Sequence, residues 1–197
     1  MTDSSTGGYV VPTNAIPAPL NDAALEDFLH DVLAGVTGLA NDLVRPRWQE
    51  EPPNLPPRNV TWAAFGVRSV SADTFPAVTH DPTAAAGQGA DILSRHQELT
   101  LLASFYGPAS QTNAERLRDG LLIAQNREAL FLAGMALVEV GEIVSAPELV
   151  KQKWLRRWDL PVIIRREVRR EYPILNLLSA SGDIISTAGT ITFNVNP

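Results

Sequence analysis

The sequence predicts an α+β fold, an α/β sandwich-like arrangement in which a mainly antiparallel four-stranded sheet carries helices on one face. Two segments of the chain place apolar residues at helical spacing, and four others alternate or cluster apolar residues as strands do. Most connections between these segments do not require a parallel crossover. The expected order is therefore α-β-β-α-β-β, followed by a C-terminal hairpin.

A single domain is expected over residues 21–197, preceded by a flexible N-terminal arm over residues 1–20. A chain of 197 residues is long enough to bury one continuous core. The arm holds Pro12, Pro17 and Pro19 among Gly, Ser and Thr residues, a composition that suits neither a helix nor a central strand. We interpret it either as disordered or as an arm that orders against a neighbouring subunit.

Two helices are expected. The first begins at Asn21 or Asp22, which are common N-cap residues, and is closed before Pro46. Its apolar residues follow i, i+3, i+4 spacing and are Leu25, Phe28, Leu29, Val32, Leu33, Val36 and Leu39. The second helix is expected over residues 110–132, with a break near Asn126.

The four expected strands cover residues 60–70, 95–106, 135–144 and 160–172. The last strand is polar on both faces in its second half, which indicates that it projects beyond the core. A short turn or helix that starts at Pro147 is expected to carry Trp154. The C-terminal hairpin is expected within residues 174–197, with its turn at residues 181–183.

Two long connections lie between these elements. Residues 45–59 hold two proline pairs, which favour an extended polyproline-like backbone. This segment is interpreted as a rigid link, with a ligand for an SH3-type partner as the alternative. Residues 71–92 are rich in Gly, Ala and Pro and are too long for a hairpin turn, so a functional or disordered loop is expected there.

The composition argues against several kinds of chemistry. The chain has no cysteine and three histidines, which excludes thiolate chemistry and leaves little material for a metal site. Neither a phosphate-binding glycine loop nor a serine nucleophile motif is present. No apolar run approaches the roughly 20 residues of a membrane helix. We therefore expect no catalytic, cofactor-binding or metal-binding residues, no cofactor and no membrane partner.

The charge is distributed unevenly along the chain. Residues 1–150 carry a formal charge of −10 and residues 151–197 carry +4, which together make the net charge of −6. A basic segment on an acidic body indicates either nucleic-acid contact or complementary faces that meet between copies of the chain. We favour the second, because Glu167 and Glu171 interrupt the basic run. The expected subunit interface consists of Trp154, Arg156, Arg157, Trp158, Arg165, Arg166, Arg169, Arg170 and Tyr172.

Several segments resemble the tail terminator or neck proteins of long-tailed bacteriophages. They are RPRWQEEPPNLPP, VTWAAFGV, RHQELTLLASFYGP, LRDGLLIAQNREAL and REYPILNLLSASGDI. The resemblance spans roughly residues 40–187. It implies a small α/β fold and a non-enzymatic virion protein, assembled in the host cytoplasm as a homohexameric ring on the tail tube. The implied partners are further copies of the chain, the tail-tube protein and the head–tail connector. DNA would pass through the ring without specific binding.

Other functions remain open at this point. The chain is alternatively another neck or tail-completion component, or a tail-tube subunit that polymerises without limit. A nucleic-acid-binding accessory protein that uses the arginine-rich strand is the alternative from a different class. An enzymatic function is the third class of alternative, and no sequence motif supports it.

Overall fold

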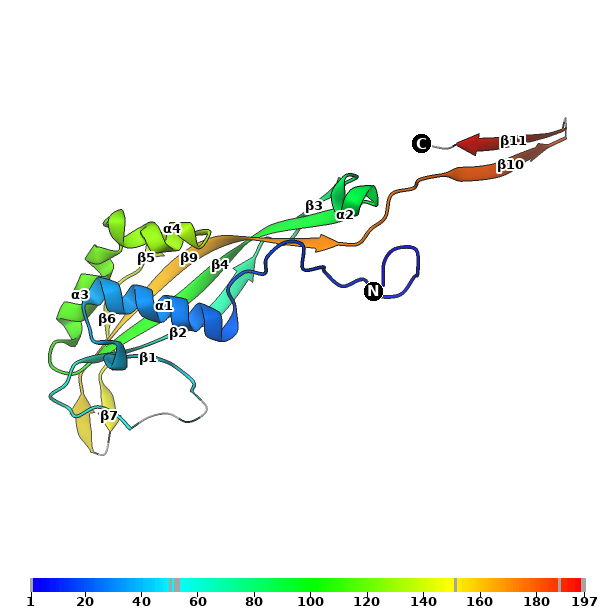
Figure 1. Cartoon of the computed structure of the whole chain (residues 1–197). Helices are drawn as coiled ribbons and strands as arrows, with labels where there is room; N and C mark the ends of the chain where they lie inside the picture. The colour runs from blue at the N-terminus through cyan, green and yellow to red at the C-terminus, as the bar shows by residue number, and fades with distance from the viewer. Residues whose placement is uncertain (1, 50, 52–53, 151, 188, 196–197) are drawn as a thin grey trace. The chain divides into compact units, whose positions relative to one another are not determined.

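The computed structural model describes residues 2–49, 51, 54–150, 152–187 and 189–195 (Figure 1). Two compact units make up the chain. The larger unit consists of Pro19–Phe75 and Arg95–Val168, and the smaller unit consists of Met1–Ala18, Pro76–Ser94 and Arg169–Pro197.

The main sheet is mixed and has seven strands in the described part of the chain. They are β1 (Val44–Pro46), β2 (Trp62–Ala72), β3 (Ala77–Asp81), β4 (Ala90–Tyr106), β5 (Met135–Val140), β6 (Val144–Ser145) and β9 (Arg157–Tyr172). The order is β1-β2-β4-β9-β5, with β3 paired to β4 and β6 paired to β9. The β1–β2 pair is parallel, whereas β2–β4, β3–β4 and β5–β9 are antiparallel.

The prediction of a mainly antiparallel four-stranded sheet is therefore wrong. The four long strands are present as β2, β4, β5 and β9, but three short strands extend the sheet. Of these, β1 lies in and before the expected proline-rich link, and β3 lies in the expected 71–92 loop. Such short strands are held by backbone pairing to a longer neighbour, so their own residues carry little periodic signal.

Of the two predicted helices, the first is confirmed and the second is divided into shorter elements. Helix α1 (Asp22–Thr37) begins after Asn21, as the capping pattern predicts. The expected second helix is divided into α3 (Ser110–Gly120), a 3₁₀ turn η2 (Gln125–Arg127) and α4 (Glu128–Leu132). The side-chain amide of Asn126 donates to the Gly120 carbonyl at 2.9 Å, beside the backbone N–H of Ile123 at 3.1 Å, and so adds a second bond at the end of α3. Two further short elements are η1 (Asn41–Leu43) and α2 (Ala84–Gly87).

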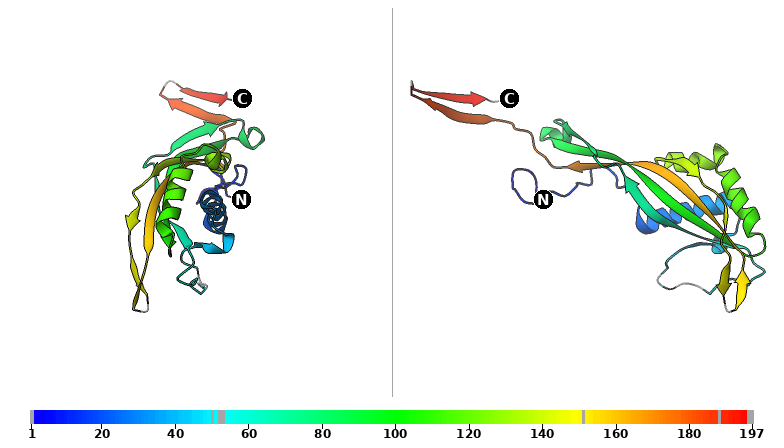
Figure 2. Two further views of the ribbon diagram at one scale, coloured as in Figure 1. Left: turned by 90° about the vertical axis from the view of Figure 1, so that its left-hand side faces the viewer. Right: turned by 180° about the vertical axis from the view of Figure 1, so that it is seen from behind.

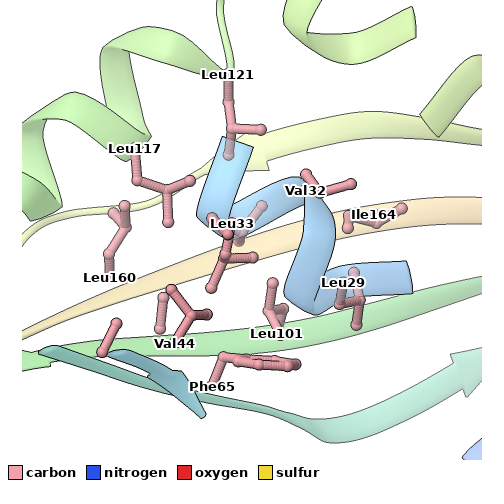
Figure 3. Packing of buried hydrophobic residues seen from close by; sticks show 14 of the residues in the cluster. Leu29, Val32, Leu33, Val44, Phe65, Leu101, Leu117, Leu121, Leu160 and Ile164 are labelled. Carbon is pink, nitrogen blue, oxygen red and sulfur yellow. The ribbon is translucent and has the colours of Figure 1, made fainter. Parts of the chain in front are cut away.

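The core of the larger unit lies between one face of the sheet and the helices. Helices α1 and α3 pack against each other and lie on the same side of the sheet in the left view of Figure 2. Leu29 and Leu33 of α1 point toward Phe65 of β2 and Leu101 of β4, and α3 adds Leu117 (Figure 3). Each of these side chains is at most 2% exposed, so each contributes about 1.5–3 kcal/mol of hydrophobic stabilisation.

Two hairpins differ in part from expectation. The segment after Pro147 is a β-hairpin of β7 (Glu148–Val150) and β8 (Lys153–Leu155), not a helix, because three residues on each side pair as antiparallel strands. The C-terminal hairpin is confirmed as β10 (Ala180–Ser186) and β11 (Gly189–Val195). The turn predicted at residues 181–183 is wrong, since these residues pair with β11 inside β10.

Candidate functional site

The residues expected at a subunit interface are distributed over β8, β9 and the short link between them. The larger unit contains Trp154, Arg156, Arg157, Trp158, Arg165 and Arg166. The smaller unit contains Arg169, Arg170 and Tyr172. Burial then separates these side chains into surface groups and groups that are engaged within the subunit.

Arg166 is engaged within the subunit. It lies on the helix-covered face of β9 and is 6% exposed. Its guanidinium donates to Oδ1 of Asn21 at 2.8 Å, to Oε1 of Gln97 at 3.0 Å and to the Leu20 carbonyl. These bonds tie the residues just before α1 to two central strands of the sheet. The role of this arginine inside the subunit is thus to fix the beginning of the first helix.

Arg165, one position earlier, lies on the opposite face and is exposed. It lines a polar hollow of about 180 Å³ together with Asp73, His96 and Glu98. The backbone N–H of His96 donates to Oδ2 of Asp73 at 3.0 Å. This hydrogen bond, with the charges of His96 and Arg165, lowers the pKa of Asp73. The helix-free face therefore carries alternating positive and negative groups.

Arg157 belongs to a second cluster on the helix-free face. Its guanidinium makes two bonds to Asp159, each 2.8 Å long, and lies 3.6 Å from Glu148 of β7. It also lies over the ring of Tyr106, 5.7 Å from the centroid, and Tyr106 stacks on Trp62 with centroids 4.3 Å apart. The Asp159 hydrogen bonds raise the pKa of Arg157, and burial raises the pKa of Tyr106.

A buried serine extends this cluster across the sheet. Ser104 is fully buried; its hydroxyl donates to Asp159 and accepts from the guanidinium of Arg47. Arg45 lies 5.8 Å from the centroid of the Trp62 ring, on the same part of the sheet. Sequence reasoning missed these partners, because their proximity depends on the register that places Trp62 opposite Tyr106.

The three aromatic residues of the expected interface differ in exposure. Trp154 on the β7–β8 hairpin is 69% exposed, whereas Trp158 is partly buried against the core. Tyr172 is half-buried at the end of β9. Trp154 is thus the large aromatic group of this set that is accessible to a partner.

An apolar groove that was not predicted from the sequence lies along α4 and β5. It has a volume of about 560 Å³, and its apolar lining is Ala124, Leu130, Phe131, Met135, Ala136 and Leu137. Phe131 is 78% exposed and Leu132 beside it is 77% exposed. A signal for this surface exists in the sequence, since adjacent apolar residues in a short helix cannot all face one core. Exposed apolar patches of this kind are typical of interaction surfaces.

The described residues also give two negative findings. Among them, no group of three or more His, Asp or Glu side chains is placed to hold a metal ion. No helix in the same part of the chain is long and apolar enough to cross a membrane.

Comparison with known proteins assigns the chain to a family. No curated protein matches its sequence. The model of the family described as phage neck terminator protein matches residues 23–189, from the start of α1 to the start of β11. This match covers most of the chain and includes the basic strand, the groove and the aromatic–arginine cluster. The chain therefore belongs to the phage neck terminator protein family, and its role is that of a structural protein at the junction of head and tail.

Proposed function

We propose that the chain assembles into a six-membered ring at the head–tail junction, where it caps the tail tube and presents a docking surface to the head connector. The match to the neck terminator family over residues 23–189 carries this proposal. The protein then acts in the virion neck without catalysis, after assembly in the host cytoplasm. Its partners are copies of itself, the tail-tube protein and the connector, while DNA passes through the lumen without base-specific contacts.

The charge distribution supports contacts between copies. Arg156, Arg165, Arg169 and Arg170 are exposed, and the chain as a whole is acidic. Helix α1 exposes Asp22, Asp27 and Asp31 on the side away from the core. In a ring with cyclic symmetry, one patch of each subunit contacts a different patch of the next. Opposite charges on two such patches favour the correct register and speed encounter.

The aromatic anchors and the N-terminal segment extend this interface. Trp154 is the exposed aromatic group closest in sequence to the basic strand, and buried aromatic side chains dominate the energy of many interfaces. Within the smaller unit, Thr13 donates to Glu171 at 2.8 Å, next to Arg170. We infer that residues 1–20 serve as an arm beside the interface and that residues 21–197 act as one functional domain.

The test is the double substitution Arg165→Glu with Arg169→Glu. Both side chains are exposed, so the subunit should fold normally but lose rings or tail joining. Light scattering behind a sizing column should give six times 21.3 kDa for wild type and a smaller mass for the variant. Arg68→Glu with Arg116→Glu reverses two exposed charges elsewhere and is the matched control. Wild-type ring formation by the Arg165/Arg169 variant would contradict the interface assignment.

The exposed arginines of β9 also favour a second candidate, a nucleic-acid-binding accessory role. Such binding weakens with salt, and log affinity falls with log salt concentration by about 0.9 per phosphate contacted. The acidic groups beside Arg165 weigh against it, because they interrupt a positive track. Absence of DNA binding at low salt would exclude this role.

A further inference from the structure

The C-terminal hairpin has one apolar face that is open to solvent. Directly opposed residues of antiparallel strands share a face, and the register pairs Gly182 with Phe193 and Ile184 with Ile191. In the isolated chain, Ile184 is 58% exposed, Ile191 67% and Phe193 41%. The other face carries mostly hydroxyl and acidic groups, with a hydrogen bond of 2.5 Å from Thr192 to Asp183. The hairpin is therefore amphipathic.

An amphipathic hairpin of this size needs a partner surface. Two strands alone are at best marginally stable in water, and a sheet with one apolar face is stable when that face packs on another element. The two residues that follow Asn176, Leu177 and Leu178, are also exposed at 86% and 54%. The apolar surface of the C-terminal segment thus extends from its link into the hairpin.

The beginning of this segment is firmly held. The backbone N–H of Asn176 donates to the Gln88 carbonyl at 2.7 Å, and its side-chain amide donates to the carbonyls of Pro82 and Gly87 at 2.9 Å. Its Oδ1 lies 2.8 Å from Nε2 of His80. Because Asn176 is fixed and β10 starts at Ala180, the start of the hairpin stays within about 14 Å of this anchor. The anchor thus limits how far from Asn176 the hairpin can begin.

The groove along α4 and β5 offers a matching surface. β5 is at the end of the strand order, so its outer edge has no strand neighbour among the described residues. A bulge after Leu137 interrupts its pairing with β9, and Met135, Ala136 and Leu137, before the bulge, line the groove. This stretch combines an unpaired backbone edge with an apolar hollow, which are the two features that an added strand uses.

We propose that the C-terminal hairpin of one copy docks in the α4–β5 groove of the next copy, with Ile191 and Phe193 in the hollow and β11 beside β5. This proposal rests on the ring proposed above and names the segment that links its subunits. A second copy is the occupant because the same chain carries both surfaces, and neither is covered by apolar side chains among the described residues of its own unit. One hairpin and one groove per subunit also give the head-to-tail contact that a closed ring requires.

Cysteine cross-linking tests the docking directly, because the chain contains no cysteine of its own. Two single-cysteine proteins are made, one with Ala136→Cys in the groove and one with Ile191→Cys on the apolar face. They carry tags of different mass and are mixed and oxidised. A disulfide forms when the Cβ atoms come within about 3.5–4.5 Å, so we expect the mixed pair on a non-reducing gel. Ile185→Cys, on the polar face of the same hairpin, is the matched control and should give little of this product.

A second experiment measures the contribution of the apolar face to assembly. Ile191→Asp should weaken association by at least 10-fold, since it places a charge in an apolar contact. Ile185→Asp adds a charge to the other face of the hairpin and should leave association within about threefold of wild type. Both positions are exposed in the subunit, so folding should not change.

The outcomes separate this proposal from the ring itself. Rings of wild-type protein without the Ala136–Ile191 cross-link would overturn the docking and leave the ring in place. The cross-link without six-membered rings would support the docking and overturn the ring. A disulfide within a single chain that carries both cysteines, in a monomer, would assign the groove to the same copy and overturn the exchange. Absence of the mixed pair overturns the docking in every case.

Discussion

Replacement of Asp159 by alanine should destabilise the subunit more than the loss of a surface ion pair would. Asp159 accepts two bonds of 2.8 Å from Arg157 and a further bond from the fully buried Ser104. The side chains of Arg157 and Asp159 are 21% and 18% exposed, so water can replace only part of what is lost. Removing one partner of a fully buried pair costs about 3–5 kcal/mol, and an exposed pair contributes about 0–1 kcal/mol. We expect about 2–4 kcal/mol here.

The assay is thermal and urea unfolding followed by circular dichroism. For a chain of this size each kcal/mol lowers Tm by about 2–4 °C, so a loss of about 2–4 kcal/mol should lower the midpoint by roughly 4–16 °C. The control is Asp119→Ala, because its pair with Arg118 is largely exposed, and it should cost less than about 1 kcal/mol. An Asp159→Ala protein within about 0.5 kcal/mol of wild type would refute the reasoning.

The adjacent residues Arg156 and Arg157 are expected to affect assembly and folding differently. Arg157→Ala should lower Tm by nearly as much as Asp159→Ala, and the double variant should cost less than the two single losses together. Arg156 is exposed, so Arg156→Ala should leave Tm within about 2 °C and act on assembly alone. Additive losses in the Arg157/Asp159 cycle would show that the two side chains do not stabilise the fold as a pair.

Three further predictions concern the C-terminal anchor and the core. The Asn176 amide oxygen, and then Asp91, raise the pKa of His80 above its usual 6.5. The stabilisation that protonated His80 gives to the anchor is therefore complete below pH 6.5 and is lost as pH rises through the raised value. Proteolysis after Asn176 should accordingly be faster at about pH 9 than at about pH 6. Gly89→Ala should release the same anchor, because φ is +92° and the added Cβ would clash with the Asn176 Oδ1. Leu33→Ala, at 2% exposure, should cost about 2–5 kcal/mol in urea unfolding.

Each of these predictions has a control. Gly87→Ala shares a positive φ of +87° but meets no atom within 4 Å, so it separates backbone strain from the steric clash at Gly89. His80→Gln should remove the pH dependence of proteolysis, and an unchanged pH profile would assign that dependence to another group. Leu122 is 61% exposed, and Leu122→Ala should cost less than about 0.5 kcal/mol. Equal losses at Leu33 and Leu122 would contradict the assignment of the core.

The long elements were predictable because their signals are local. The apolar spacing of α1 and the alternation of β4 and β9 repeat over many residues, and a long amphipathic segment has few other ways to bury its apolar side chains. The short strands β1, β3 and β6 were missed for the opposite reason. Two to five residues carry no periodic signal, and their structure comes from backbone bonds to distant strands.

The features of the candidate site also fall into those that the sequence determined and those that only the tertiary structure decided. Sequence by itself determined the family, the acidic body with a basic C-terminal segment, and the opposite faces of Arg165 and Arg166, since adjacent residues of a strand point in opposite directions. Only the tertiary structure decided that Arg166 is enclosed by Asn21 and Gln97 while Arg165 meets water. The same holds for the Arg157 cluster and the α4–β5 groove. The contacts of the Arg157 cluster join residues far apart in the chain, which the pairing register brings together. The groove is lined by residues close in sequence, and it depends on how α4 packs against β5.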